Sequence, residues 1–340
     1  MSRETQEWLE NNILVGFTEK RGIAWWYRGV DRKDGSPNHF EGAIPVGTVQ
    51  EKLFDWEPAK APIYYESFPG EWTEIPGKQR VYASDNIHHT FGIVSDGYEP
   101  HGFSEWLIGN VSNILQDTLS ISSAGLLRNR AVAWVEISVP ENVTTPEGVT
   151  FRPNLLATTS LDSSIATTYK RTQTMTVCDN TYAMALAESG QTYKRRHTKF
   201  SNTKAEQDRA REILGLLARD AETVSDTIRD LCHQEVTEIQ FKEVLRLAIP
   251  FDTESKTGVT VAEKKMNEIE ALYRNDERVA PWSGTAFGVL QAFNTWDHHL
   301  KSTRGDTNRV ERNMYAAVSG QRDKADASIL NYLTQALETV

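Results

Sequence analysis

The sequence predicts an α+β protein in which a strand-rich N-terminal part with a packed helix precedes a helical C-terminal part. Up to about residue 200, short runs rich in Val, Thr and aromatic residues alternate with Gly- and Pro-containing turns, as in a sheet. From residue 203 onward, apolar residues recur every three or four positions, as in amphipathic helices. We therefore expect an α+β domain over residues 1–200 and a helical domain over residues 201–340.

Several runs of the first part have strand composition, because β-branched and aromatic residues dominate them. They are residues 22–28, 80–83 with 90–95, 131–139, 149–152 and 167–177. Turns are expected where Pro and Gly cluster, at residues 68–70, 75–77 and 146–148. Apolar residues spaced by three and four predict a helix over residues 101–117, and a shorter helix is expected over residues 181–188.

The second part begins with a sustained apolar seam from Ala210 to Leu231, which predicts a long amphipathic helix. A polar loop is expected over residues 251–258. Further helices are predicted over residues 238–248, 261–274, 284–302, 309–318 and 322–338.

Composition excludes several classes of protein. The chain carries 37 Lys and Arg against 47 Asp and Glu, a net charge of −10, which argues against a histone-like coat on duplex DNA. No apolar run is long enough to cross a membrane, no signal-peptide core is seen, and two cysteines are too few for a disulfide scaffold. We expect a cytoplasmic protein. Phosphate-binding glycine motifs are absent, so no nucleotide or other cofactor is predicted.

One segment reverses this charge. Residues 151–200 hold seven basic and three acidic side chains, and residues 193–200 alone combine four cations with two aromatic residues. Cations neutralise phosphates and aromatic faces stack on unpaired bases, so this pattern favours a groove for single-stranded nucleic acid; a solvated, ion-paired surface is the alternative. The candidate phosphate contacts are Arg128, Arg130, Arg152, Lys170, Arg171, Lys194, Arg195, Arg196 and Lys199, and the candidate stacking residues are Tyr169 and Tyr193.

Histidine pairs, a cysteine and the acidic first part of the chain are further candidates for function, each on fewer observations. The pairs His88–His89 and Asp297–His298 allow a metal-dependent nuclease, although neither has the spacing of a metal motif, and no metal is predicted. Cys178 follows a predicted strand and is expected to be a buried structural thiol. Residues 1–150 carry a net charge of −9, which allows an acidic protein that binds and inhibits a host defence or restriction protein.

Three blocks of sequence carry a family resemblance. They are YASDNIHHTFGIVSDGYEP at residues 82–100, MTVCDNTYAMAL at 175–186 followed by Arg-His-Thr at 196–198, and TAFGVLQAFNTWDHH at 285–299. Together they resemble the phage/plasmid-like protein family, a domain of unknown function of bacteriophages, prophages and plasmids, over about residues 22–320. One turn departs from the expected pattern, because residues 161–164 read Leu-Asp-Ser-Ser in place of a His-Asp-Gly-like turn.

The resemblance implies a mobile-element accessory protein. It also suggests a distant similarity to single-strand annealing proteins of the RecT and Red-beta kind, which hold one DNA strand in a basic groove of a ring or filament. We therefore expect a non-catalytic recombination protein that binds and anneals single-stranded DNA without ATP and forms a homo-oligomer. The host-protein inhibitor and the metal-dependent nuclease stay open as alternatives.

Overall fold

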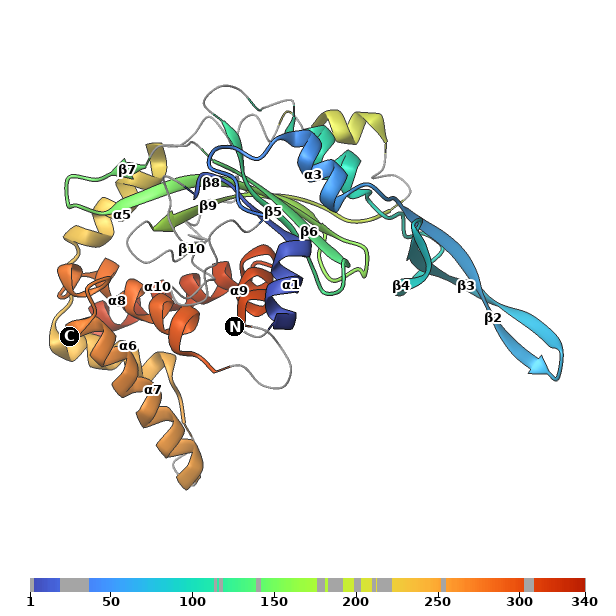
Figure 1. Ribbon diagram of the computed structural model, residues 1–340. Helices are drawn as coiled ribbons and strands as arrows, with labels where there is room; N and C mark the ends of the chain where they lie inside the picture. The colour runs from blue at the N-terminus through green and yellow to red at the C-terminus, as the bar shows by residue number, and fades with distance from the viewer. Residues whose placement is uncertain are drawn as a thin grey trace. The chain divides into compact units, whose positions relative to one another are not determined.

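The computed structural model describes most of the chain and divides it into two compact units, each discontinuous in sequence (Figure 1). The described residues are 3–18, 37–112, 115, 119–138, 142–175, 181–182, 192–198, 203–209, 212, 222–251, 255–302 and 309–339. Unit 1 comprises residues 1–140, 154–171 and 189–220, and unit 2 comprises residues 141–153, 172–188 and 221–340. The predicted α+β class is confirmed, whereas a single boundary at residue 200 does not coincide with this division.

The larger antiparallel sheet has residues in both units, because two of its strands are divided between them. Its described strands follow the order β1-β5-β6-β8-β9-β10, with β11 also paired to β9 and β7 to β8. They are β1 (Ile13–Val15), β5 (Ser120–Leu127), β6 (Val132–Ser138), β7 (Val143–Thr144), β8 (Thr150–Ser160), β9 (Thr167–Met175), β10 (Thr181–Tyr182) and β11 (Thr192–Arg195). Strands β8 and β9 cross from one unit to the other within their length.

The centre of this sheet is covered on both faces in unit 1. Every residue of β6 except Glu136 is buried, so the strand has lost the alternation of a one-sided sheet. Helices α1 (Arg3–Asn12) and α3 (Val46–Leu53) contact β5, and the π-helix η2 (Ser104–Gly109) contacts β6. Trp106 and Tyr169 belong to the hydrophobic core of this unit, and Trp134 of β6 is likewise almost fully buried.

Unit 1 contains a second, three-stranded sheet, and two of its strands form a long hairpin. It consists of β2 (Pro58–Phe68), β3 (Glu71–Ala83) and β4 (Asn86–Ser95). Figure 1 shows β2 and β3 as a long ribbon. The turn predicted at residues 75–77 is wrong: β3 continues through it, and the register shifts there between Pro62 and Tyr64 of the facing strand. Gly77 adopts a φ of 71°, so the Pro-Gly signal marks a bulge in the strand.

Unit 2 is mainly helical. Its described helices are α5 (Glu222–His233), α6 (Glu238–Ala248), α7 (Lys256–Asn275), the 3-10 turn η3 (Ala280–Trp282), α8 (Ala286–Thr295), the π-helix η4 (Trp296–Leu300), α9 (Arg309–Val318) and α10 (Gln321–Thr339). Their apolar faces enclose a core that also takes Val149 and Phe151 from the sheet. In the part of the chain that the structure describes, no helix is long and apolar enough to cross a membrane.

Most predicted elements are confirmed where the structure describes them. The helices predicted over residues 238–248 and 309–318 have the predicted bounds, and α5 covers the end of the predicted 210–231 helix. Residues 181–182 were predicted helical but form β10, because they pair with Gln173 and Thr174 of β9. The expected strand over residues 22–28, the remainder of the 181–188 helix and Cys178 lie outside the described residues.

Candidate nucleic-acid interface

Four of the predicted cations lie at one end of the larger sheet. Leu127 of β5 pairs with Val132 of β6, and Val132 pairs with Ser160 at the end of β8. On the next strand but one, Arg195 of β11 pairs with Thr167 at the start of β9. The β5–β6 turn, with Arg128 and Arg130, therefore lies at the same end of the sheet as the last residues of β11, Arg195 and the following Arg196. Strands β6 and β11 are three strand spacings apart, which is about 14 Å.

The β5–β6 turn at this end has an unusual backbone. Arg128, Asn129 and Arg130 all adopt positive φ values, of 50°, 54° and 69°. The left-handed conformation is unfavourable for residues with a side chain, and such strain concentrates at functional sites. Arg128 forms an ion pair with Asp162 at 3.3 Å. Arg130 pairs with Asp85 at 2.9 Å and lies over the Trp56 ring.

The neighbouring β8–β9 turn is the one that departs from the family pattern. Ser163 also has a positive φ, of 65°, and the Asp162 carboxylate accepts hydrogen bonds from the backbone and side chain of Ser164. The Tyr98 hydroxyl donates to the Ser160 carbonyl oxygen at 3.2 Å. Burial raises the pKa of Tyr98 above its ordinary value, so the phenol stays protonated.

Near this turn, four rings of unit 1 form a continuous stack; three come from residues 98–106, and the fourth belongs to His197. Tyr98 stacks on His197 with centroids 5.1 Å apart, and His197 stacks on His101 at 4.3 Å. His101 in turn stacks on Trp106 of η2 at 3.9 Å. Two blocks that carry the family resemblance therefore meet here, since Tyr98 belongs to one and His197 to another.

Two threonines join the histidines through hydrogen bonds. His101 Nδ1 lies 2.6 Å from Thr167 Oγ1, and His197 Nε2 lies 3.1 Å from Thr159 Oγ1. The two hydroxyl oxygens are 2.8 Å apart. Burial lowers the pKa of His197 to about 4; burial, then the charges of His197 and Arg195, lowers that of His101 to about 2. Both imidazoles are therefore neutral near pH 7.

The two histidines and the two threonines of this network are not among the site residues that the sequence predicts. The sequence places His101 and Thr167 only in a predicted helix and a predicted strand, and His197 in the basic segment and the family blocks. One sequence signal for the network is the Arg-His-Thr motif at residues 196–198. Its histidine follows shortly after β11, so it lies at the sheet end described above.

Exposed and half-buried side chains alternate along the basic segment that includes strand β11. Lys194 and Arg196 are exposed, while Tyr193 and Arg195 are half-buried. Arg195 pairs with Glu206 at 3.1 Å, and one face of the Tyr193 ring lies on Tyr169, with centroids 5.6 Å apart. Within the described residues, Lys194 and Arg196 form no ion pair. The segment thus offers two solvent-facing cations and one partly accessible aromatic ring.

The other predicted residues are less accessible. Tyr169 is fully buried, and its hydroxyl donates to the Trp106 carbonyl oxygen at 2.7 Å. Lys170 is buried, and Arg171 is half-buried. Arg152 belongs to unit 2, where its buried guanidinium donates to Asn142 at 2.6 Å. Lys199 lies outside the described residues. The predicted residues that stay at least partly accessible at this sheet end are therefore Arg128, Arg130, Tyr193, Lys194, Arg195 and Arg196.

The histidines considered for metal have other partners. His88 is exposed, and His89 Nε2 lies 2.8 Å from the Asn129 carbonyl oxygen of the strained turn. In unit 2, His298 of η4 is buried, with Nδ1 2.8 Å from the Asn294 carbonyl oxygen. Asp297 contacts the buried Arg322 and also pairs with Lys301 at 2.5 Å. Among the described residues, no three His, Cys, Asp or Glu side chains are grouped to hold a metal ion.

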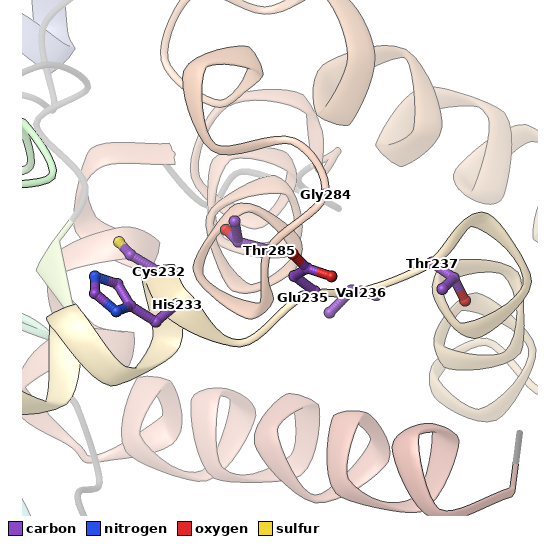
Figure 2. Close-up of a pocket in the computed structure, with 7 residues that line it drawn as sticks. All are labelled: Cys232, His233, Glu235, Val236, Thr237, Gly284 and Thr285. Atoms are coloured by element: carbon purple, nitrogen blue, oxygen red, sulfur yellow. The ribbon is translucent and has the colours of Figure 1, made fainter.

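Unit 2 has an open depression of about 560 Å³ between the end of α5 and the starts of α6 and α8. Figure 2 shows Cys232 and His233 side by side at one edge, with Thr237 at the other. Burial, followed by the charge of Glu147, raises the pKa of the Cys232 thiol to about 12. The thiol is therefore protonated at neutral pH and is a poor nucleophile. This depression does not support covalent catalysis.

These features define an α+β protein with a basic, strained sheet end above a buried ring stack. A family model, the domain of unknown function DUF932, matches residues 90–318, which include the two turns, the ring stack and most of unit 2. The chain therefore belongs to the DUF932 family. No curated protein and no solved structure matches the chain.

Proposed function

We propose that this protein is a mobile-element recombination accessory factor that binds and anneals single-stranded DNA without ATP. The proposal rests on one observation: cations from the β5–β6 turn and from the end of β11, far apart in sequence, lie at the same end of one sheet. The resemblance to phage and plasmid proteins, and through it to RecT-like annealing proteins, supports the same function.

The ion pairs at this end are compatible with phosphate binding. Arg128, Arg130 and Arg195 each pair with one carboxylate, but every pair is partly exposed to solvent. Such surface pairs contribute about 0–1 kcal/mol, so a phosphate can compete for the guanidinium groups. Lys194 and Arg196 add two exposed charges beside them. Tyr193 supplies the ring for base stacking, because Tyr169 has no accessible surface.

The test is fluorescence anisotropy of a labelled single-stranded oligonucleotide over a range of salt concentrations. The variant combines Arg128→Asn, which tolerates the left-handed backbone, with Arg196→Ala. Each lost phosphate contact should reduce the slope of log affinity against log salt by about 0.7, so the double variant should lose about 1.4. The control replaces two exposed cations of α6, Lys242→Ala with Arg246→Ala.

Three results would refute this assignment. They are an absence of binding by the wild type at low salt, an unchanged slope in the double variant, and an equal loss in the control variant. A preference for duplex over single-stranded DNA would contradict the annealing function. A strand-annealing assay without nucleotide then follows, in which the double variant should be slower than the control.

A further inference from the structure

The tip of the β2–β3 hairpin exposes large aromatic side chains. Tyr64 and Tyr65 are 50% and 51% exposed, and Phe68 and Trp72 are 69% and 64% exposed. Strand β4 pairs with β3 only from Lys78 to Ala83, so residues 63–75 form a two-stranded ribbon beyond the third strand. Large exposed apolar groups on one element mark an interaction surface, and Trp and Tyr dominate the energetics of such surfaces.

The charge of this tip restricts its partner. Residues 63–75 include Glu66, Glu71 and Glu74 and contain no Lys, Arg or His. Through the register of the ribbon, Tyr64 pairs with Glu74 and Glu66 pairs with Trp72, so aromatic rings and carboxylates share one face. Carboxylates repel phosphates, which disfavours nucleic acid and anionic lipid as partners. A surface with exposed cations is complementary to the tip.

Unit 1 itself carries such a surface, but the hairpin cannot reach it within one molecule. The Arg130–Asp85 ion pair, at 2.9 Å, and the contact of His89 Nε2 with the Asn129 carbonyl oxygen, at 2.8 Å, place the β3–β4 turn beside the basic sheet end. Strand β3 then runs thirteen residues from Ala83 back to Glu71, which places the acidic tip about 40 Å from Arg130. The acidic tip and the basic sheet end can therefore meet only between two molecules.

We propose that the tip of the β2–β3 hairpin docks on the basic sheet end of a second copy of this chain, near Lys194 and Arg196. Because the two surfaces are different and lie at opposite ends of β3, the contact is head-to-tail. Repetition of such a contact builds a ring or a filament. The inference does not depend on DNA binding, although a DNA strand and a docked tip would compete for the same cations.

Sedimentation velocity without nucleic acid tests this contact over a range of protein and salt concentrations. The wild type should associate with rising concentration, and added salt should weaken the association. Glu71→Lys with Glu74→Lys should abolish it, and so should Lys194→Glu with Arg196→Glu. Glu66 is left unchanged, because its carboxylate accepts the Gly70 amide of the turn at 2.7 Å. The matched control is Glu263→Lys with Glu338→Lys, on exposed helix faces of unit 2.

A mixture of the two charge-reversed proteins decides the pairing. Each tip-reversed molecule is complementary to the reversed sheet end of the other protein, so association should return in the mixture. The double variant Phe68→Ala with Trp72→Ala should weaken association at least tenfold with its charge unchanged. A wild type that stays monomeric at the highest concentration attainable overturns the inference. So does an association that either charge reversal leaves intact, or a mixture that stays monomeric.

Discussion

The imidazole rings of His101 and His197 stack in the interior of unit 1, with centroids 4.3 Å apart and planes inclined by 19°. They are 96 residues apart in the sequence, and Trp106 and Tyr98 extend the stack at either end. Protonation of both rings would place two like charges side by side in a buried position, and burial keeps both imidazoles neutral near pH 7. The stack therefore makes the stability of the basic sheet end dependent on pH.

Acid should unfold the protein through these histidines. The pKa of His197 is about 4 in the folded state and about 6.5 when unfolded, so below pH 6.5 the unfolded chain binds a proton that the folded chain does not. Its contribution to the free energy of unfolding should be constant above pH 6.5. It should fall by about 3 kcal/mol between pH 6.5 and pH 4. Urea unfolding at several pH values measures this.

The variant His197→Gln isolates the effect. Glutamine can hydrogen-bond to Thr159 and does not titrate, so the pH profile of the variant should be flatter than that of the wild type. The control, His88→Gln, removes an exposed imidazole and should leave the profile as it is. If His197→Gln and the wild type lose stability in parallel on acidification, the stack is not the acid-sensitive element.

Tyr169 should act as a structural residue. Its hydroxyl donates to the Trp106 carbonyl oxygen and accepts from the Asn110 amide at 2.8 Å. Tyr169→Phe leaves both partners without this group in a buried place, which should cost about 1–3 kcal/mol of unfolding free energy. Affinity for single-stranded DNA, measured where the variant is folded, should not change. A large loss of affinity with unchanged stability would instead place Tyr169 in contact with the ligand.

Gly288 should not tolerate a side chain. It lies in the first turn of α8, and a Cβ atom there would collide with the backbone oxygen of Trp282. Because backbone cannot rotate away as a side chain does, Gly288→Ala should lower the free energy of unfolding by more than about 2 kcal/mol. Gly47→Ala in α3 meets no atom and should be neutral or stabilising, by up to about 1 kcal/mol. Thermal unfolding of the two variants gives the comparison.

Arg322 should be needed for the helical core of unit 2. It is 2% exposed, contacts Asp297 and donates to Asn313 at 3.4 Å. Arg322→Met removes a buried, hydrogen-bonded guanidinium while Asp297 keeps its pair with Lys301, and should cost about 1–3 kcal/mol in a denaturant titration. The comparison is Arg246→Met, which breaks an exposed pair with Glu243 and should cost about 0–1 kcal/mol. Equal effects of the two substitutions would contradict the structure.

Local sequence was enough to predict most of the C-terminal helices that the structure describes, although α7 begins at Lys256, inside the loop expected over residues 251–258. Helix periodicity and caps act within a few residues, and α6 begins at the predicted position because Thr237 and Gln240 form a capping box. The basic composition of residues 151–200 is local too, whereas the exposure of Lys194 and Arg196 between half-buried neighbours on β11 is a result of the structure. The strand composition around residue 80 predicted part of the hairpin, but its Pro-Gly bulge was misread as a turn.

Tertiary structure decided what pairs with what. A strand does not encode its neighbours locally, so only the register of β6, β8, β9 and β11 places Arg128 and Arg196 at one sheet end. The same pairing buries Tyr169, which in sequence looks like any aromatic beside a cation, and turns residues 181–182 into a strand. The sequence by itself determined the fold class, the helices and the local charge. The assembled sheet determined which of those charges and rings form a surface, because burial and register depend on residues that are distant in the chain.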